Sequence, residues 1–190
     1  MNRTAQYLLA FVFGITATVQ LAVPLSMISR REAVLRAGSE HRFQTRPVDP
    51  YDAFRGRYVA LGFEHHSVAV TNADGMERGR RVYVSLATDA AGFSRPAGIA
   101  FSRPMSGDYL KTRVEYVSGT SGEGIGTNVI VQMPFDRFYM NEEDAPATEA
   151  AFNTASRRDG AKPAYARVRI LNGMAVLEDL VVEDTPVRVK

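Results

Sequence analysis

The stretch that decides the architecture of this chain is Tyr7–Ile28, which reads YLLAFVFGITATVQLAVPLSMI. These 22 residues include no charged side chain, whereas Arg3 precedes them and Arg30 and Arg31 follow them. A helix of this length measures about 33 Å and matches the roughly 30 Å of hydrocarbon in a bilayer. Only a helix satisfies all of its own backbone hydrogen bonds in lipid without a partner. We therefore expect an N-terminal transmembrane helix.

Two other interpretations of this stretch stay open. A cleaved signal peptide has an apolar core of about 7–15 residues and a cleavage site of small residues. Here the stretch is longer, and it ends in the bulky Leu25, Met27 and Ile28 directly before the arginines. A buried core helix is the other alternative, although an uncharged run of this length is rare in a soluble domain. We expect an uncleaved anchor in contact with membrane lipid.

One face of the predicted span carries small residues. Ala10, Gly14 and Thr18 recur every four positions, so they share a face on which a second helix can approach closely. Gln20 can form a hydrogen bond across such a contact. Small residues are also common in spans that have no partner. We expect this face to be the helix-packing face, with an integral membrane protein as partner.

The side of the membrane on which the rest of the chain lies is not settled by charge. Five arginines lie between residues 30 and 46, against Arg3 on the N-terminal side, so the positive-inside rule taken literally places the large domain in the cytoplasm. A short basic N-terminus before an apolar run is also how exported anchors begin. We expect a single-pass protein of a bacterial inner membrane, with either side open.

The chain as a whole has the composition of a globular protein. Of the 190 residues, 45% are hydrophobic and 23% are charged, which excludes a wholly disordered chain. Without Arg3 there are 22 basic residues against 21 acidic ones, so we expect no nucleic-acid partner. The absence of cysteine excludes disulfides, cysteine-bound metal and a cysteine nucleophile.

We divide the chain into residues 1–38, the anchor with an extension from Arg31 to a C-capping Gly38, and residues 39–190, one β-rich domain. Alternation of apolar and polar residues, with Gly and Pro between the runs, predicts the strands. They are Arg42–Arg46, Tyr58–Val70 with an internal Gly62, Arg81–Ala87, Phe93–Phe101, Tyr109–Val117, Asn128–Met133, Ala164–Leu171 and Met174–Val182.

Two local signals complete the fold prediction. Asn141–Ser156 begins with a capping Asn and acidic residues and is rich in Ala, which predicts a helix. Asn172-Gly173 between two apolar runs predicts a tight hairpin. The expected fold class is α+β: a transmembrane helix, then a single mostly antiparallel domain, a sandwich or partial barrel, with one packed helix.

Arg46–Glu64, RPVDPYDAFRGRYVALGFE, resembles the signature of the GDYXXLXY family of bacterial membrane-anchored proteins of unassigned function. Asp136-Arg137-Phe138-Tyr139, followed by Glu142, resembles a second family element. Arg57 and Phe63 depart from the pattern, where the family has an acidic residue and a tyrosine. The matching positions, which the resemblance marks as structural or interaction residues, are Asp49, Pro50, Arg55, Gly56, Tyr58, Leu61, Arg137 and Glu142, together with Pro47 and Val48.

The resemblance implies a single-span anchor that carries one small β-rich domain and accompanies another membrane protein. It implies no catalytic residue. Arg57 in place of the family aspartate favours a structural role for the motif, because arginine cannot replace a catalytic acid or a metal ligand. From the residues alone, we expect the strand at Tyr58–Phe63 to be buried and central, with Leu61 and Phe63 on one face.

No constellation in the sequence predicts chemistry. His65 and His66 are neighbours and point to opposite faces of a strand, so they do not hold one metal ion simply. Glu142, Glu143 and Asp144 suit a helix N-terminus. His41 is expected in solvent near the membrane exit. We expect no catalytic, metal or cofactor site. We therefore expect an accessory or assembly partner of a membrane protein in preference to an enzyme. The alternative is a small envelope hydrolase or ligand-binding protein that uses Glu142, Asp144 or His66.

Overall fold

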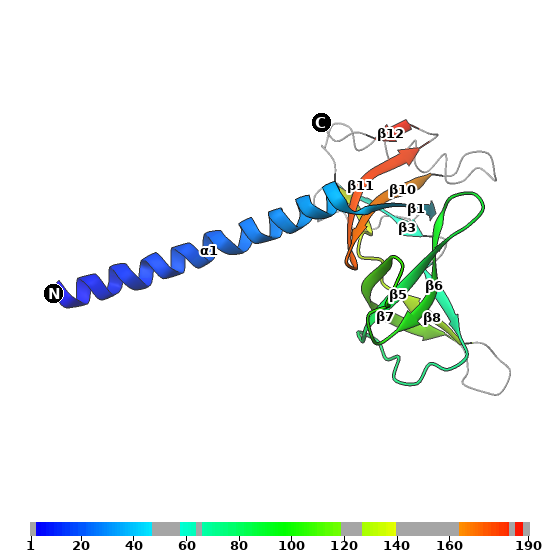
Figure 1. The fold of residues 1–190 in the computed structure, drawn as a ribbon, viewed down its shortest axis with the longest axis horizontal. Helices are drawn as coiled ribbons and strands as arrows, with labels where there is room; N and C mark the ends of the chain where they lie inside the picture. The colour runs from blue at the N-terminus through cyan, green and yellow to red at the C-terminus, as the bar shows by residue number, and fades with distance from the viewer. Residues whose placement is uncertain are drawn as a thin grey trace.

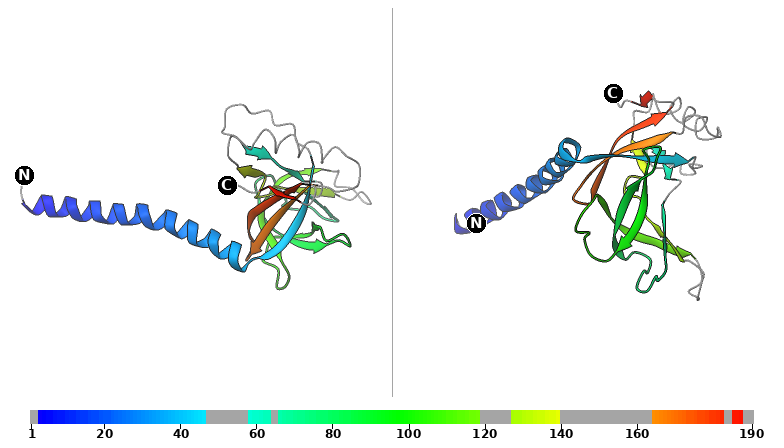
Figure 2. Two further views of the ribbon diagram at one scale, coloured as in Figure 1. Left: turned by 90° about the horizontal axis from the view of Figure 1, so that it is seen from above. Right: turned by 45° about the vertical axis from the view of Figure 1, so that its right-hand side comes forward.

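The computed structural model describes residues 3–46, 58–63, 66–118, 127–139, 164–182 and 185–187, and of residues 4–5, 58–60, 137–139 and 185–187 the backbone only. Helix α1, Arg3–Ala37, projects from a β-rich body, which we call the head (Figures 1 and 2). In the described part of the chain, this helix is long and apolar enough to cross a membrane, judged by length and composition.

The first sheet of the head is antiparallel and has five strands in the order β12-β11-β10-β1-β3. Their bounds are β1 Ser39–Arg46, β3 Gly62–Phe63, β10 Tyr165–Leu171, β11 Met174–Val182 and β12 Thr185–Val187. Strands β10 and β11 form the predicted hairpin. Asn172 and Gly173 both have positive φ, 52° and 80°, as a type I′ turn requires.

The second sheet is also antiparallel and five-stranded, in the order β4-β8-β7-β5-β6. Its strands are β4 Ser67–Val70, β5 Arg81–Thr88, β6 Ser94–Ala100, β7 Tyr109–Ser118 and β8 Thr127–Val131. The edge strands β4 and β6 approach each other, so the sheet curls almost into a barrel (Figure 1). A separate pair, β2 Tyr58–Ala60 and β9 Arg137–Tyr139, completes the described strands.

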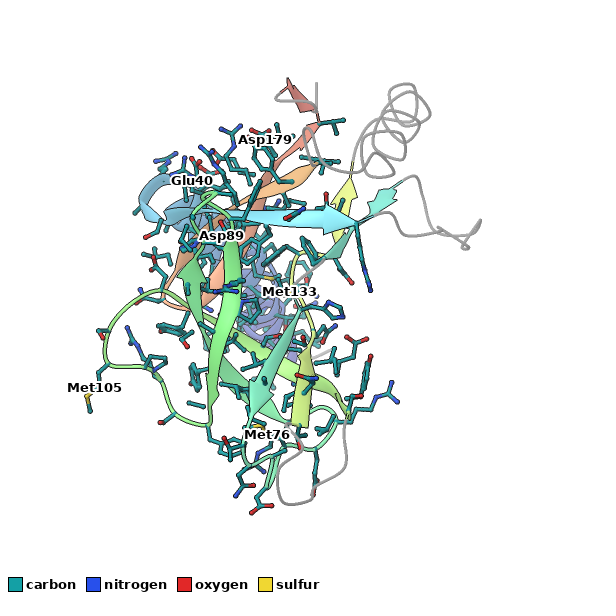
Figure 3. All side chains as sticks on the ribbon, turned by 90° about the vertical axis from the view of Figure 1, so that its right-hand side faces the viewer. Glu40, Met76, Asp89, Met105, Met133 and Asp179 are labelled. Atoms are coloured by element: carbon teal, nitrogen blue, oxygen red, sulfur yellow. The ribbon has the colours of Figure 1, made fainter. Side chains whose placement is uncertain are left out.

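Both five-stranded sheets contribute to one hydrophobic core. Along β7 the pattern is the predicted one, with Leu110 and Val114 buried and Lys111 exposed between them. Phe135 packs against Phe43 and Phe63 at ring-centroid distances of 5.0 and 5.2 Å and so connects the segment after β8 to the first sheet. Met133 lies in the middle of the head, whereas Met105 lies at its edge (Figure 3).

The hairpin of the first sheet is docked on the second sheet. The backbone N–H of Lys111 donates to the carbonyl oxygen of Gly173 over 2.9 Å. A Cβ at Gly173 would lie 2.5 Å from the ring of Tyr109, so no other residue fits there without a shift. Arg103 lies over the same ring, 5.5 Å from its centroid, and donates to the side-chain oxygen of Asn172. The turn therefore joins the two sheets.

Helix α1 passes into β1 through a single residue, Gly38. The last turns of α1 contact β10 and β11, and Val34 is buried there. A Cβ at Gly38 would lie 2.5 Å from the carbonyl oxygen of Val34 and 3.0 Å from the backbone nitrogen of Ile170. Glycine is therefore required for the helix to meet the sheet this closely. Pro24 lies inside α1, which continues through it.

The structure confirms the predicted fold class, α+β with an N-terminal apolar helix followed by antiparallel sheets. One prediction is wrong: Tyr58–Phe63 is not a single central strand. The strand-rich stretch Tyr58–Val70 is divided into β2, the edge strand β3 and the edge strand β4, because successive parts pair with β9, β1 and β8. The helix predicted at Asn141–Ser156 lies outside the described residues.

Candidate functional site

Two segments that are distant in the sequence meet at β2 and β9. Tyr58 is paired with Tyr139 and Ala60 with Arg137, in antiparallel register. The pairing continues past β2, because the backbone N–H of Leu61 donates to the carbonyl oxygen of Asp136 over 2.8 Å. The described parts of both sequence elements that carry the family resemblance, residues 58–61 and 136–139, therefore belong to one local unit of the structure.

A cavity of about 610 Å³ lies beside this unit, and we call it the cationic cavity. It is bordered by β3, by the loop between β4 and β5, by β7, and by the end of β8 with the residues that follow. Its floor is made of side chains that are each at most 5% exposed: Leu61, Phe63, Val114, Val131 and Met133. Among the described residues, those of its lining that are ionisable are Arg46, His66, Arg78, Arg113, Glu115 and Asp136.

The arginines of the cationic cavity differ in how they are held. Arg113 donates from Nη1 to the carbonyl oxygen of Gly79 over 2.7 Å, which fixes the guanidinium against the β4–β5 loop. Arg46 and Arg78 form no ion pair with any residue in the described ranges. His66 is half-buried, and its Nδ1 lies 3.0 Å from the carbonyl oxygen of Phe63. Two of the three arginines thus have guanidinium groups available to a ligand.

A second, smaller cavity of about 350 Å³ lies between the head and the end of α1. It is bordered by Arg31 of α1, by Phe135 and Asp136, and by the start of β11 from Met174 to Leu177. Asp136 therefore borders both cavities. The segment between β8 and β9 separates the cationic cavity from the base of the helix.

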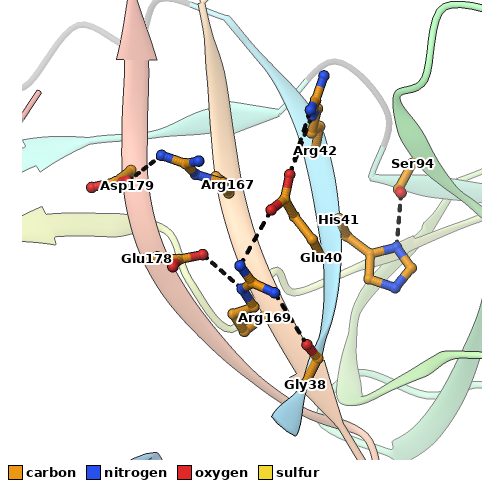
Figure 4. Close-up of polar contacts among 9 residues, drawn as sticks. All are labelled: Gly38, Glu40, His41, Arg42, Ser94, Arg167, Arg169, Glu178 and Asp179. Atoms are coloured by element: carbon orange, nitrogen blue, oxygen red, sulfur yellow. Dashed lines mark hydrogen bonds and ion pairs between the residues drawn. The ribbon is translucent and has the colours of Figure 1, made fainter. Parts of the chain in front are cut away.

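His41 bridges the two sheets, which corrects the expectation that it lies in solvent. It is buried on β1, with Nδ1 2.9 Å from the Ser94 hydroxyl of β6 (Figure 4) and Nε2 3.1 Å from the Asp108 carboxylate just before β7. A proton on Nε2 satisfies both partners, because Nε2 then donates to Asp108 while Nδ1 accepts from Ser94. The sequence pattern of β1, which alternates, places His41 on the same face as Phe43.

Ser94, His41 and Asp108 contain the groups of a serine hydrolase, yet their placement does not suit catalysis. A nucleophilic hydroxyl must reach a substrate carbonyl. Ser94 is only 4% exposed, and neither of the head cavities described above is lined by any of the three residues. We interpret these three residues as a structural bridge that connects the sheets through hydrogen bonds to the buried His41.

A network of charged residues supports the junction of α1 with the head (Figure 4). Arg169 of β10 donates to Glu178 of β11 over 2.8 Å, to Glu40 of β1 over 3.3 Å, and from Nη1 to the Gly38 carbonyl over 3.4 Å. A cation is favourable next to the last carbonyls of a helix. Beside it, Arg167 is paired with Asp179.

The environment of Arg169 stabilises its charge. Its hydrogen bond to Glu178 raises its pKa above the ordinary value, and the charges of Glu178 and Glu40 act in the same direction, against the effect of burial. A guanidinium held by two acids from neighbouring strands fixes β1, β10 and β11 relative to the end of α1.

Comparison with known proteins now identifies the chain. The model of the family described as GDYXXLXY protein matches residues 20–180 of the 190-residue chain. The chain belongs to the GDYXXLXY family. No curated protein and no solved structure matches it.

The structure describes part of the GDYXXLXY signature. Leu61 is buried in the core, and Tyr58 and Arg137 lie in paired strands, where the backbone alone is described. Six further signature positions lie outside the described residues: Pro47, Val48, Asp49, Pro50, Arg55 and Gly56. Glu142, with Glu143, Asp144 and His65, lies outside them too. The roles assigned to these positions stay predictions.

The small-residue face of α1 in this GDYXXLXY protein is exposed. Ala10, Gly14 and Thr18 line a shallow hollow with Phe11, Ile15 and Val19. A Cβ at Gly14 would meet no atom within 4 Å, and the Thr18 hydroxyl donates to the Gly14 carbonyl oxygen over 2.8 Å. The face therefore has room for another helix, and the Thr18 hydroxyl already has a hydrogen-bond acceptor within α1.

Sequence reasoning missed the residues that the fold brings together. Arg46, Arg78 and Arg113 come from three separate segments, and no spacing in the sequence connects them. His41, Ser94 and Asp108 are equally dispersed. Within the described ranges, no group of three or more His, Cys, Asp or Glu residues is placed to hold a metal ion.

Proposed function

We propose that this GDYXXLXY protein is a single-pass membrane-anchored module of the bacterial inner membrane that serves as an accessory or assembly partner of another membrane protein. The observation that carries the proposal is the exposure of α1. Its apolar side chains point outward all around the helix, and none of the apolar window is buried by the head. A helix that is apolar on every side needs a lipid or protein environment.

The ends of the helix support a membrane position. Arg30 and Arg31 follow the apolar run and suit the headgroup region, where arginine side chains reach toward water. Only the last turns of α1, with Val34 buried, pack on the head. The head is therefore expected to lie close to the bilayer at an orientation fixed by the Gly38 junction.

An accessory role requires a partner, and α1 offers a face for one. The face of Ala10, Gly14 and Thr18 allows close backbone approach, and close packing is what drives helix association in lipid. In the part of the head that the structure describes, the buried placement of Ser94 also argues against this serine as a nucleophile.

Photo-crosslinking within cells tests the partner. A photoreactive residue at Gly14 is expected to give a crosslinked product with another membrane protein. The same residue at Thr16, on the opposite face of the helix, serves as the matched control. Gly14→Leu is expected to remove co-purification in mild detergent, and Thr16→Leu to leave it unchanged. Recovery of the wild type as a lone monomer, with no crosslink from either face, would overturn the proposal.

A further inference from the structure

We infer that the cationic cavity binds a small ligand with a single carboxylate group, seated among Arg46, Arg78 and Arg113. This goes beyond the membrane role, and it does not depend on that role, because none of the residues that border the cationic cavity belongs to α1.

The size and the lining of the cavity fit a small molecule. Ligand pockets have volumes of about 300–1,000 Å³ and combine an apolar wall with a few convergent polar groups. The cationic cavity, at about 610 Å³, has a floor of buried apolar side chains and a polar rim. The three arginines are exposed at the rim, so the floor offers apolar contact to a ligand and the arginines offer charge.

The charge of the lining selects the ligand class. Among the described ionisable lining residues, leaving His66 aside, three arginines against Glu115 and Asp136 leave one net positive charge. One positive charge complements a monoanion better than a dianion such as sulfate. A guanidinium also presents paired N–H donors that match the two oxygens of a carboxylate.

The three arginines of the cavity are held differently, and both arrangements suit ligand binding. Arg113 is oriented by its hydrogen bond to the Gly79 carbonyl, so little conformational entropy is lost when it contacts a ligand. Arg46 and Arg78 form no ion pair with the described residues, unlike Arg36, Arg42, Arg167 and Arg169, which are all paired with acids.

Fluorine NMR of the full chain in nanodiscs tests the inference. The probes are 4-(trifluoromethyl)benzoate and its uncharged amide, 4-(trifluoromethyl)benzamide, with empty nanodiscs to subtract partitioning into lipid. We expect saturable binding of the benzoate, and binding of the amide weaker by about tenfold or more, the effect of losing a charged hydrogen-bond acceptor. Equal binding of the two probes would overturn the inference.

Variants locate the probe. Arg46→Gln and Arg78→Gln are each expected to weaken benzoate binding by about tenfold. Arg113 also holds the loop at Gly79, so a substitution there would disturb the fold of the cavity. The Arg46 and Arg78 variants therefore test the binding site instead of an Arg113 variant. Arg95→Gln, an exposed arginine of β6 outside the cavity lining, is the matched control and is expected to bind normally. A loss of affinity in Arg95→Gln equal to that in Arg78→Gln would contradict the assignment.

Sulfate, which carries two negative charges at neutral pH, distinguishes a monoanion site from a dianion site. We expect sulfate at the concentration of the probe to leave the benzoate bound. Displacement of the benzoate by sulfate at that concentration would contradict the carboxylate assignment. Loss of membrane attachment would leave every one of these expected results unchanged, so failure of this inference and failure of the proposed function can be told apart.

Discussion

Leu61 and Asp136 are joined by a backbone hydrogen bond of 2.8 Å, in which the amide of Leu61 donates to the carbonyl oxygen of Asp136. This bond extends the β2–β9 pairing to the border of the cationic cavity, because both residues line it. The described residues of the two signature elements, 58–61 and 136–139, thus form one structural unit. The side chain of Leu61 completes that unit by filling the core below it.

Leu61→Ala is expected to lower the free energy of unfolding by about 2–5 kcal/mol, because it leaves a void in the core. Leu61→Met conserves most of the volume and is expected to cost less than about 1.5 kcal/mol. Urea titration in detergent micelles, followed by fluorescence of the eight tyrosines, measures both. Equal midpoints for Leu61→Ala and the wild type would show that Leu61 does not support the core.

His41→Ala is expected to destabilise the head by about 1–3 kcal/mol, since it leaves the buried Ser94 hydroxyl without its imidazole partner. Ser94→Ala breaks one of the two side-chain hydrogen bonds of His41, whereas His41→Ala removes both, so Ser94→Ala is expected to cost less. A double-mutant cycle of the two substitutions measures their coupling. If the free-energy changes of the two single substitutions add up to that of the double substitution, the bridge between the sheets is contradicted.

Local patterns in the sequence predicted much of this fold. Alternation placed Leu110 and Val114 in the core correctly, and Asn172-Gly173 marked the β10–β11 turn, because side-chain direction and positive φ are set by neighbouring residues. The strands β9 and β12 were missed. Each has three residues, too few for a periodic pattern to be recognised.

Long-range placement could not be predicted in the same way. The division of Tyr58–Val70 into three strands depends on which distant segments pair with it. The burial of His41 depends on Ser94, which is 53 positions away in the sequence. The arginines of the cationic cavity became visible as a group only through the same long-range pairing.

Gly38→Ala is expected to lower the free energy of unfolding by about 1–3 kcal/mol, because the added Cβ would overlap with the Val34 carbonyl and the backbone of Ile170. Gly14→Ala, in the open part of the same helix, is the matched control and is expected to be neutral or slightly stabilising. Thermal unfolding followed by near-UV circular dichroism compares them. A neutral Gly38→Ala would show that the helix does not pack this closely on the head.

Arg169→Gln is expected to cost about 1–2 kcal/mol, with Arg95→Gln as the neutral control, because Arg169 holds Glu40 and Glu178 beside the helix end. Since folding raises the pKa of Arg169, its contribution is fully present below its ordinary pKa and is lost only as the pH rises through the raised value. The difference between wild type and variant should therefore stay constant between about pH 6 and 9. A difference that falls across this range would contradict the assigned network.

The central claim is that Tyr7–Ile28 stays in the membrane and anchors the head. The most direct test is to determine which parts of the chain remain in membranes after extraction with alkaline carbonate. Mass spectrometry of the pellet reports whether peptides from Tyr7–Ile28 remain joined to the head. The account predicts that the pellet retains the protein with this apolar stretch intact. Release into the supernatant of a shortened chain, which begins after Ile28 and contains the head, would contradict the account.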